Sequence, residues 1–334
     1  NRPVDATPIW LMRQAGRYMA DYRALRAQYS ILELIHSPEL AAEVTLQPIR
    51  AFDVDAGIIF SDILPPLTSM GLDLTFRKGD GPVILNPLRE AADIEALSVP
   101  DGPEVLPSTL GAIRIVVDEL AGKVPMIGFA GAPFTLASYA IEGGSTRNYW
   151  RVKSLMYQTP RVWHDLMEKL SRLVAGHLIA QIHAGAAAVQ IFDSWVGALS
   201  PDDYREYVLP HVQRAASMVK EAEPDTPLIY FGTGTAGFLA DFASVEADII
   251  GVDWRQNLDT AWNVIGHDRG IQGNLDPLLL NAPDAIMRHH ASRILDAANG
   301  RNNHIFNLGH GIIKETNPER VGALVDFVHS YSAR

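Results

Sequence analysis

The chain has 334 residues, of which 47% are hydrophobic and 20% charged, a balance that is ordinary for a globular protein. Its formal net charge of -11 argues against a nucleic-acid partner, and the lack of an apolar run of about 18 residues argues against a membrane-spanning helix. The absence of cysteine excludes disulfides, thiol nucleophiles, iron–sulfur clusters and Cys-ligated zinc, and it suits a reducing cytoplasm.

The first residues, NRPVDATPIW, lack the basic-then-apolar layout of a signal peptide. The chain does not begin with Met, so we expect that a short leader has been trimmed. Nothing in this segment indicates export, and we expect a soluble, cytoplasmic protein.

Short apolar runs rich in Ile, Val and Phe alternate with longer helical patterns along the chain. Near-continuous hydrophobicity within each run is typical of parallel strands that are buried on both faces. The pattern predicts eight strands, at 8–13, 56–62, 125–131, 187–193, 227–232, 248–253, 269–274 and 304–309.

Helix-start signals lie between the predicted strands. Ser37-Pro38, Ser200-Pro201 and Asn317-Pro318 each combine a capping side chain with a proline suited to the first helical position. Eight strand–helix alternations predict an α/β fold, a single (β/α)8 TIM barrel over residues 1–334, although a doubly wound open sheet would give the same local pattern. Strand-like pieces around KGDG within 67–85 predict a small hairpin insertion after the second strand.

Polar or small residues recur where the predicted strands end. In a barrel enzyme these ends and the loops after them build the active site, so we expect the side chains to converge. Any one of them could instead cap a helix or a turn. The strand-end residues are Arg13, Gln14, Asp62, Phe129, Gly131, Asp193, Ser194, Gly232, Asp253, Asn274 and His310.

Arginines are concentrated after the first predicted strand. Arg13, Arg17, Arg23 and Arg26 lie within fourteen residues of an otherwise acidic chain. Because a guanidinium binds oxyanions through two parallel hydrogen bonds, the cluster predicts capture of carboxylates or phosphates. Arg23 also fits a surface position on the following helix. His310, between two glycines, fits either a ligand contact or a structural role.

Two other patterns resemble functional motifs. GTGTAG at 232–237 follows a strand and matches G-x-G-x-x-G, with Asp253 at the spacing of a ribose-binding acid, but it lies in the fifth strand–helix unit and fits a tight turn better than a dinucleotide site. His289 and His290 are adjacent on a predicted helix and point apart, so they do not form a metal pair. Motifs of serine hydrolases, P-loop nucleotidases and zincins are absent from the sequence.

Five segments in this order resemble the uroporphyrinogen decarboxylase family: PIWLMRQAGRYMADYR, AGIIFSDIL, GFAGAPFTLASYAIEGG, QGNLDP and FNLGHGI. The resemblance runs over nearly the whole chain. It implies a barrel that forms a homodimer and, with neither cofactor nor metal, removes the four acetate carboxyl groups of uroporphyrinogen III. The products are coproporphyrinogen III and CO2, and the eight carboxylates of the substrate would explain the arginines.

The resemblance also implies roles for individual residues. Asp62 matches the aspartate under the macrocycle, where it would stabilise a cationic pyrrole intermediate, and Phe129 matches an apolar wall. Lys314 departs from the family pattern and puts the shape of its loop in question. The implied substrate-binding residues are Arg13, Gln14, Ala15, Gly16, Arg17, Arg26, Asp62, Phe129, Tyr139, Ser194 and His310.

The chemistry leaves the proton donor open. The pyrrole ring can accept the electron pair that decarboxylation releases, provided that a ring carbon is protonated first. Arg13 is a weak acid, so His310 or a water held by Tyr139 is better suited to donate the proton. We therefore expect Asp62, Arg13, Tyr139 and His310 to be the catalytic residues.

Two other functions are compatible with parts of the pattern. A cobalamin-dependent methyltransferase would share the barrel, but its zinc site needs cysteine, which this chain lacks. A non-enzymatic tetrapyrrole carrier could keep the arginines and the apolar wall, but it would not need a buried, unpaired Asp62.

Overall fold

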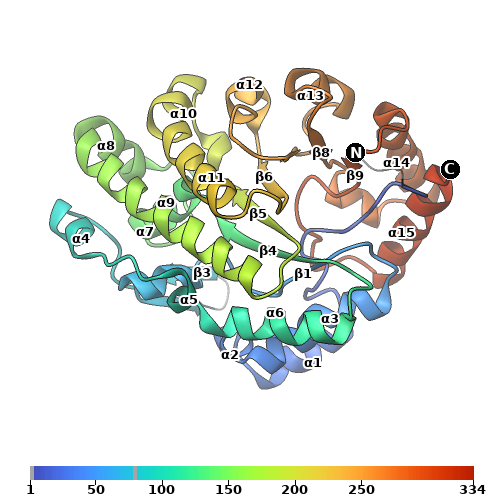
Figure 1. The fold of residues 1–334 in the computed structure, drawn as a ribbon, viewed down its shortest axis with the longest axis horizontal. Coiled ribbons are helices and arrows are strands. Elements are labelled where there is room, and N and C mark those ends of the chain that lie inside the picture. The colour runs from blue at the N-terminus through green and yellow to red at the C-terminus, as the bar shows by residue number, and fades with distance from the viewer. Residues whose placement is uncertain (1–3, 78–80) are drawn as a thin grey trace.

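The computed structural model describes residues 4–77 and 81–334. Within these residues, seven parallel strands form one curled sheet whose neighbours follow the order of the chain (Figure 1). The strands are β1 (Gly57–Ile58), β4 (Met126–Gly131), β5 (Ala188–Asp193), β6 (Leu228–Gly232), β7 (Ile249–Gly251), β8 (Gly270–Gln272) and β9 (His304–Ile305).

The segment around Ile9 closes the sheet between β9 and the approach to β1. Ile9 forms a parallel bridge with Phe306, whose N–H donates to the Pro8 carbonyl at 2.8 Å. On the other side, the Asp55 N–H donates to the Ile9 carbonyl at 2.9 Å. The fold is therefore a (β/α)8 barrel, as the sequence predicts.

The predicted first strand at 8–13 is wrong in length, because only Ile9 forms a bridge. Beyond Ile9, side chains accept the backbone N–H groups that a neighbouring strand would otherwise bind. The Leu11 N–H donates to Gln14 Oε1 at 3.1 Å, and the Met12 N–H donates to Asn307 Oδ1 at 3.0 Å. Arg13 then adopts a left-handed conformation, with φ 59°, which turns the chain out of the sheet.

The predicted strands at 56–62 and 304–309 are also too long. β1 ends at Ile58 and β9 ends at Ile305. Beyond these points side chains again satisfy the backbone: the Phe60 N–H donates to Thr45 Oγ1 at 2.9 Å. Asp62 and His310 consequently lie in loops that follow the strands.

Helices cover the outside of the sheet (Figure 1). No helix of the described residues is long and apolar enough to cross a membrane. The helices are α1 (Ala20–Gln28), α2 (Ile31–His36), α3 (Pro38–Ala51), α4 (Ala91–Ala96), α5 (Gly102–Val105), α6 (Pro107–Leu120), α7 (Pro133–Glu142), α8 (Trp150–Gln158), α9 (Pro160–His183), α10 (Pro201–Tyr207), α11 (Leu209–Ala222), α12 (Leu239–Phe242), α13 (Leu258–Ile265), α14 (Asp284–Ala298) and α15 (Pro318–Ser332), with 3-10 turns η1 (Pro65–Met70), η2 (Val196–Ala198), η3 (Thr235–Phe238) and η4 (Pro277–Asn281).

The three helix-start signals are confirmed. The side chains of Ser37, Ser200 and Asn317 each accept a backbone N–H in the first turn of α3, α10 and α15. In each helix the following proline occupies the first helical position, where its missing N–H costs no intrahelical bond.

The insertion after the second predicted strand is a hairpin, as expected. β2 (Leu74–Arg77) pairs antiparallel with β3 (Gly81–Ile84). The KGDG turn between them falls on 78–80, which lie outside the described residues, and on Gly81. β3 packs against α7, because the Ile84 N–H donates to the carbonyl of Gly143, directly after that helix.

The interior of the barrel is packed. Trp10, Met12, Ile58, Ile127 and Phe231 form a buried cluster inside the ring of strands. Polar groups within it satisfy one another: for example, the Trp10 Nε1–H donates to the side chain of Gln272 at 3.1 Å. In barrels of this kind ligands are bound at the carboxyl ends of the strands.

Candidate functional site

The predicted site residues lie on loops and elements that follow the strands. Asp62 comes after β1, Ser194 directly after β5 and His310 after β9, while Phe129 is within β4 and Tyr139 is on α7. All five are partly exposed, whereas most of the neighbouring strand residues are fully buried. They are therefore placed where a ligand could reach them.

The loop between Ile9 and α1 presents arginines and is held by its own backbone. The Gln14 side chain is fully buried and donates to the Ala56 carbonyl at 3.2 Å, so it fixes the loop instead of facing the site. The Tyr18 hydroxyl donates to the Gln14 carbonyl at 2.6 Å. The left-handed residue of this turn is Arg13 rather than Gly16, and both Gly16 and Ala15 are partly exposed in the loop.

The four arginines of the cluster have different environments. Arg23 donates to the carbonyls of Arg17 and Tyr18, at 3.0 and 2.7 Å, and so stabilises the turn before α1. Arg26 donates to the Tyr29 carbonyl. Arg13 and Arg17 are exposed, and no side-chain hydrogen bond of either guanidinium occurs within the described part of the chain. These two are the arginines best placed to bind an anion.

Tyr22 is a buried residue of α1, next to the arginine cluster, that sequence reasoning did not single out. Burial raises the pKa of its hydroxyl, while the positive charges of Arg26 and Arg17 lower it and the charge of Asp62 raises it. The charges of both arginines and of Asp62 therefore act on the Tyr22 hydroxyl. In the sequence, its position four residues before Arg26 is the available signal, and such spacing is common on any amphipathic helix.

Asp62 carries the anionic charge of the site. Its Oδ1 accepts the Leu64 N–H at 2.9 Å. Burial raises the pKa of the carboxyl, and this effect exceeds the opposing influence of the Leu64 and Ile63 N–H groups and of the Arg13 charge. The second oxygen, Oδ2, has no hydrogen-bond partner among the described residues, so it can accept bonds from a ligand.

Tyr139 lies beside Asp62 on an aromatic stack. Its ring stacks on Trp195 with the centroids 3.9 Å apart, and Tyr149 meets Trp195 edge-on at 5.4 Å. Burial raises the pKa of the Tyr139 hydroxyl, as does the Asp62 charge, whereas the Arg13 charge lowers it. No hydrogen bond of this hydroxyl occurs within residues 4–77 and 81–334, so it is available to water or substrate.

His310 lies between two glycines that other segments approach closely. A Cβ on Gly309 would lie 2.4 Å from the backbone nitrogen of Trp254, so glycine is required there, and one on Gly311 would lie 2.3 Å from Cδ of the Arg13 side chain, which would have to move. The Gly311 N–H donates to Nδ1 of the imidazole at 2.7 Å, which leaves the proton of the neutral ring on Nε2.

Burial, followed by the charges of Arg13 and Arg255, lowers the pKa of His310 to about 4. The imidazole is therefore neutral at pH 7 and can donate a hydrogen bond through Nε2–H. This protonation state does not favour His310 as the proton donor of the reaction.

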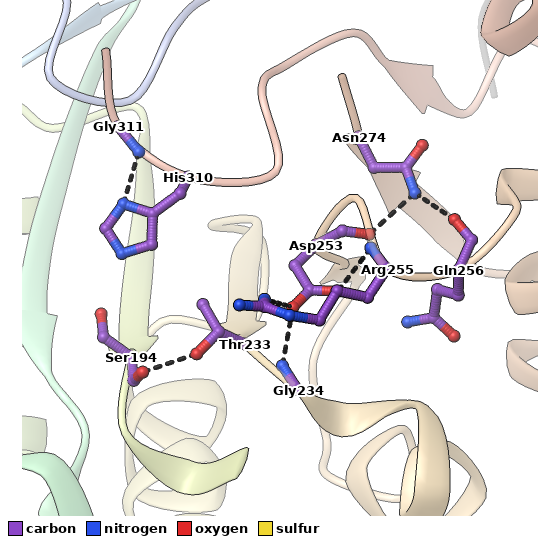
Figure 2. Close-up of polar contacts among 9 residues, drawn as sticks. All are labelled: Ser194, Thr233, Gly234, Asp253, Arg255, Gln256, Asn274, His310 and Gly311. Atoms are coloured by element: carbon purple, nitrogen blue, oxygen red, sulfur yellow. Dashed lines mark hydrogen bonds and ion pairs between the residues drawn. The ribbon is translucent and has the colours of Figure 1, made fainter. Parts of the chain in front are cut away.

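Phe129, in β4, and Ser194, directly after β5, belong to two neighbouring strands. The Phe129 ring meets Phe192 edge-on at 5.5 Å, and its backbone is fixed by the Gln181 side chain of α9 on both its N–H and its carbonyl, at 2.8 Å. The Ser194 carbonyl accepts the Thr233 hydroxyl at 2.6 Å (Figure 2). Phe129 thus supplies an apolar surface and Ser194 a hydroxyl.

Two further strand-end carboxylates are used by the protein itself. Asp193 is fully buried and accepts the hydroxyls of Thr135 and Tyr230, at 2.7 and 2.9 Å. Asp253 is also fully buried and accepts the Gly234 N–H at 2.7 Å (Figure 2). Both side chains therefore support loops of the site without being open to it.

The remaining strand-end residues and the GTGTAG motif are also structural. The Asn274 side chain donates to the carbonyls of Asp253 and Gln256, both at 2.8 Å (Figure 2). Residues 232–237 form a tight turn, with Gly234 at φ 70°, that leads into the short η3. Asp253 is occupied by this turn and is not free for a ribose hydroxyl, as expected from the position of the motif.

Comparison with known proteins places the chain among decarboxylases. A family model described as "Uroporphyrinogen decarboxylase (URO-D)" matches residues 1–331. A uroporphyrinogen decarboxylase of Roseiflexus sp. (strain RS-1) is 56% identical over 335 residues, which cover 99% of this chain and 96% of that protein. One from Chloroflexus aurantiacus is 57% identical over 332 residues, covering 99% and 93%.

Similar solved structures have the same barrel. A methyltransferase from Methanosarcina mazei superposes with a TM-score of 0.83 at 21% identity, covering 98% of this chain and 95% of that chain. A B12-independent methionine synthase from Shewanella sp. W3-18-1 superposes with a TM-score of 0.58 at 9% identity. At these identities the likeness concerns the fold alone.

Proposed function

We infer the roles of the site residues from the premise that this chain belongs to the uroporphyrinogen decarboxylase family. Its function is the decarboxylation of uroporphyrinogen in porphyrin and haem biosynthesis, and it is a carboxy-lyase. The residue-level mechanism below is our proposal. The observation that carries it is the juxtaposition of Asp62 with Arg13 and Tyr139 at the open end of the barrel.

We propose that Asp62 stabilises the cationic intermediate. Protonation of the ring carbon next to the one that bears an acetate makes the pyrrole positively charged and leaves the acetate-bearing carbon able to accept electrons. The bond to the carboxyl carbon then breaks, its electron pair enters the ring, and CO2 leaves. A second protonation produces the methyl group, and the ring carbon loses its extra proton. Pyrrole N–H groups that donate to Asp62 bind the carboxylate more strongly in the cationic state, which is the condition for catalysis.

The arginines bind the carboxylates of the substrate. Arg13 lies within electrostatic range of Asp62, Tyr139 and His310, so we assign it to the acetate that reacts. Arg17 and Arg26, which surround the Tyr22 hydroxyl, are assigned to other carboxylates. The backbone of Gln14, Ala15 and Gly16 completes this loop, and the buried Gln14 side chain holds it in place.

We assign proton delivery to a water bound by Tyr139. Arg13 is too weak an acid, and His310 is neutral at pH 7 because its pKa is lowered to about 4. The charges of Asp62 and Arg13 both act on the pKa of the Tyr139 hydroxyl, and this hydroxyl has no hydrogen-bond partner among the described residues. His310 and Ser194 then serve as hydrogen-bond donors to the substrate.

The mechanism is tested by incubating the purified protein with uroporphyrinogen III under anaerobic conditions, without added cofactor. Products are oxidised and separated by chromatography. Progressive loss of carboxyl groups supports a cofactor-independent decarboxylase. A dependence on an added metal or organic cofactor would contradict the proposal that the pyrrole alone accepts the electron pair.

We further propose a single-domain, cytoplasmic homodimer. Support comes from the family resemblance together with a sheet in which segments from both ends of the chain are neighbours. Sedimentation equilibrium tests the dimer, since a monomer mass at micromolar concentration would contradict it. A single thermal transition that coincides in fluorescence and circular dichroism tests the single domain.

A further inference from the structure

Arg255, on the loop after β7, lies at the site but belongs to none of the predicted binding residues. Its guanidinium forms an ion pair with the fully buried Asp253, and it lies 4.2 Å from the centroid of the Trp254 ring. Its side chain nevertheless remains 52% exposed. The guanidinium is therefore fixed at one end and open at the other.

The loop that bears His310 packs directly against the loop that bears Arg255. Gly309 lies against the backbone of Asp253 and Trp254, where a Cβ would be 2.4 Å from the Trp254 nitrogen. Two residues further on, Gly311 lies against the side chain of Arg13. His310 consequently sits between two guanidinium groups, and both act on the charge of its ring.

Polar groups from three other loops accompany Arg255. Asp253 Oδ2 joins the Arg255 guanidinium to the Gly234 N–H, and the neighbouring Thr233 hydroxyl donates to the Ser194 carbonyl. Figure 2 shows the guanidinium directed toward the side on which Thr233, Ser194 and His310 lie. The Ser194 carbonyl holds the Thr233 hydroxyl, and the buried Asp253 carboxylate holds one end of the Arg255 guanidinium. The outer edge of the guanidinium is left for a ligand.

We propose that Arg255 binds a propionate carboxylate of the tetrapyrrole, across His310 from Arg13. This inference rests on the proposed function. Arg13, with Asp62 and Tyr139, is placed for the reacting acetate, so Arg255 meets a different side chain. Acetates are converted to methyl groups in successive turnovers while propionates persist. A propionate is therefore the carboxylate that Arg255 can keep through every turnover.

The test uses binding of coproporphyrinogen III, which keeps its propionates and has no acetates. Removing one charge-assisted contact at a half-exposed site weakens binding about tenfold, so Arg255→Gln is expected to raise the Kd by about that factor. The KM for uroporphyrinogen III rises similarly, and kcat changes little. Arg255→Lys restores part of the affinity, because it keeps the charge without the planar fork.

Arg214→Gln is the matched control. Arg214 is 54% exposed and pairs with one carboxylate, Glu168, on the outside of the barrel. In Arg255→Gln, the backbone N–H groups of Gly234 and of residue 255 still donate to the Asp253 carboxylate. The loop therefore keeps two of its hydrogen bonds, and the circular dichroism spectrum is expected to be unchanged.

Three results would overturn the assignment. One is an unchanged Kd for coproporphyrinogen III in Arg255→Gln, and another is an equal loss of affinity in Arg214→Gln. The third is a raised KM for uroporphyrinogen III with normal product binding, which would indicate an acetate contact instead. Because the Kd is measured without turnover, failure of wild-type decarboxylation would count against the proposed function separately.

Discussion

Two aspartate–tyrosine pairs occupy the carboxyl end of the barrel, and they differ in how far the protein itself satisfies them. In the inner pair, Asp193 accepts the Tyr230 hydroxyl at 2.9 Å and also the Thr135 hydroxyl, and the aspartate and Tyr230 are fully buried. In the outer pair, Asp62 accepts the Leu64 N–H and has the Tyr139 hydroxyl nearby without a hydrogen bond.

The difference separates structural from functional polar groups at the same end of the strands. Burial raises the pKa of both aspartates, and for Asp193 the value is about 6. The Asp193 carboxylate accepts hydrogen bonds from the hydroxyls of Thr135 and Tyr230. It therefore supports the loop that carries Ser194. The Asp62 charge lacks such compensation, so its remaining bonding capacity is available to a ligand.

The sharpest way to break this comparison is Asp62→Asn. Asparagine keeps the shape and can still accept the Leu64 N–H, but it removes the negative charge that faces the cationic intermediate. We expect kcat to fall about 100-fold or more, as happens when one preorganised electrostatic contact is lost. Anaerobic turnover of uroporphyrinogen III measures this effect. Turnover close to that of the wild type would show that Asp62, like Asp193, is structural.

Tyr230→Phe sharpens the comparison from the other side. It removes one hydroxyl from the buried Asp193 carboxylate and should lower the free energy of unfolding by about 2 kcal/mol. The Tyr230 bond lowers the pKa of Asp193, so its loss costs more when Asp193 is ionised. The loss of stability should therefore be larger at pH 8 than at pH 5, because the pKa of about 6 lies between them.

Tyr139→Phe is the matched control for Tyr230→Phe. The Tyr139 hydroxyl has no hydrogen bond within the described part of the chain, so its removal should change the unfolding free energy by less than about 0.5 kcal/mol. It should instead reduce kcat. Chemical denaturation and turnover, measured on both variants, decide the matter: a large stability loss in Tyr139→Phe would place it with the inner pair.

Arg17→Ala probes binding on the outer side. Arg17 is exposed, and its positive charge lowers the pKa of the Tyr22 hydroxyl, whereas the charge of Arg13 lowers the pKa of Tyr139. We expect KM to rise about tenfold with kcat within about threefold of wild type, because one charge-assisted contact is lost in both ground and transition states. A kcat loss as large as that of Asp62→Asn would place Arg17 at the reacting acetate.

Much of the fold and part of this contrast were predictable from the sequence. Alternating apolar runs and the caps at Ser37, Ser200 and Asn317 predicted the barrel correctly. The ends of several strands were predicted wrongly. There, side chains such as those of Gln14 and Thr45 accept the backbone N–H groups that a neighbouring strand would otherwise bind. Such substitutions depend on residues that come together only in the folded chain.

The same limit applies to the site. Asp62, Asp193 and Asp253 all follow predicted strands, and the sequence gives no way to rank them. Their difference lies in donors from distant segments, such as Thr135 and Tyr230 for Asp193 and Gly234 for Asp253. Family resemblance selected Asp62, which periodicity alone could not do, and the structure leaves Asp62 partly exposed whereas Asp193 and Asp253 are fully buried.

The smallest expected effect concerns the stability of the outer pair. Burial raises the pKa of Asp62 in the folded protein above its unfolded value, so the ionised carboxylate opposes folding. The folded state holds its proton more tightly, and this contribution to stability is therefore lost as the pH rises through the folded-state pKa. At pH 8, Asp62→Asn should therefore be more stable than wild type.

That gain should shrink as the pH falls, because the wild-type carboxyl also becomes neutral below its folded-state pKa. Thermal unfolding of both proteins from pH 4 to 8 measures it. If Asp62→Asn loses turnover and gains stability, the negative charge of Asp62 serves the reaction and is not needed for folding. If Asp62→Asn were instead less stable at pH 8, the carboxylate would be held by structural contacts, and the distinction between the two pairs would fail.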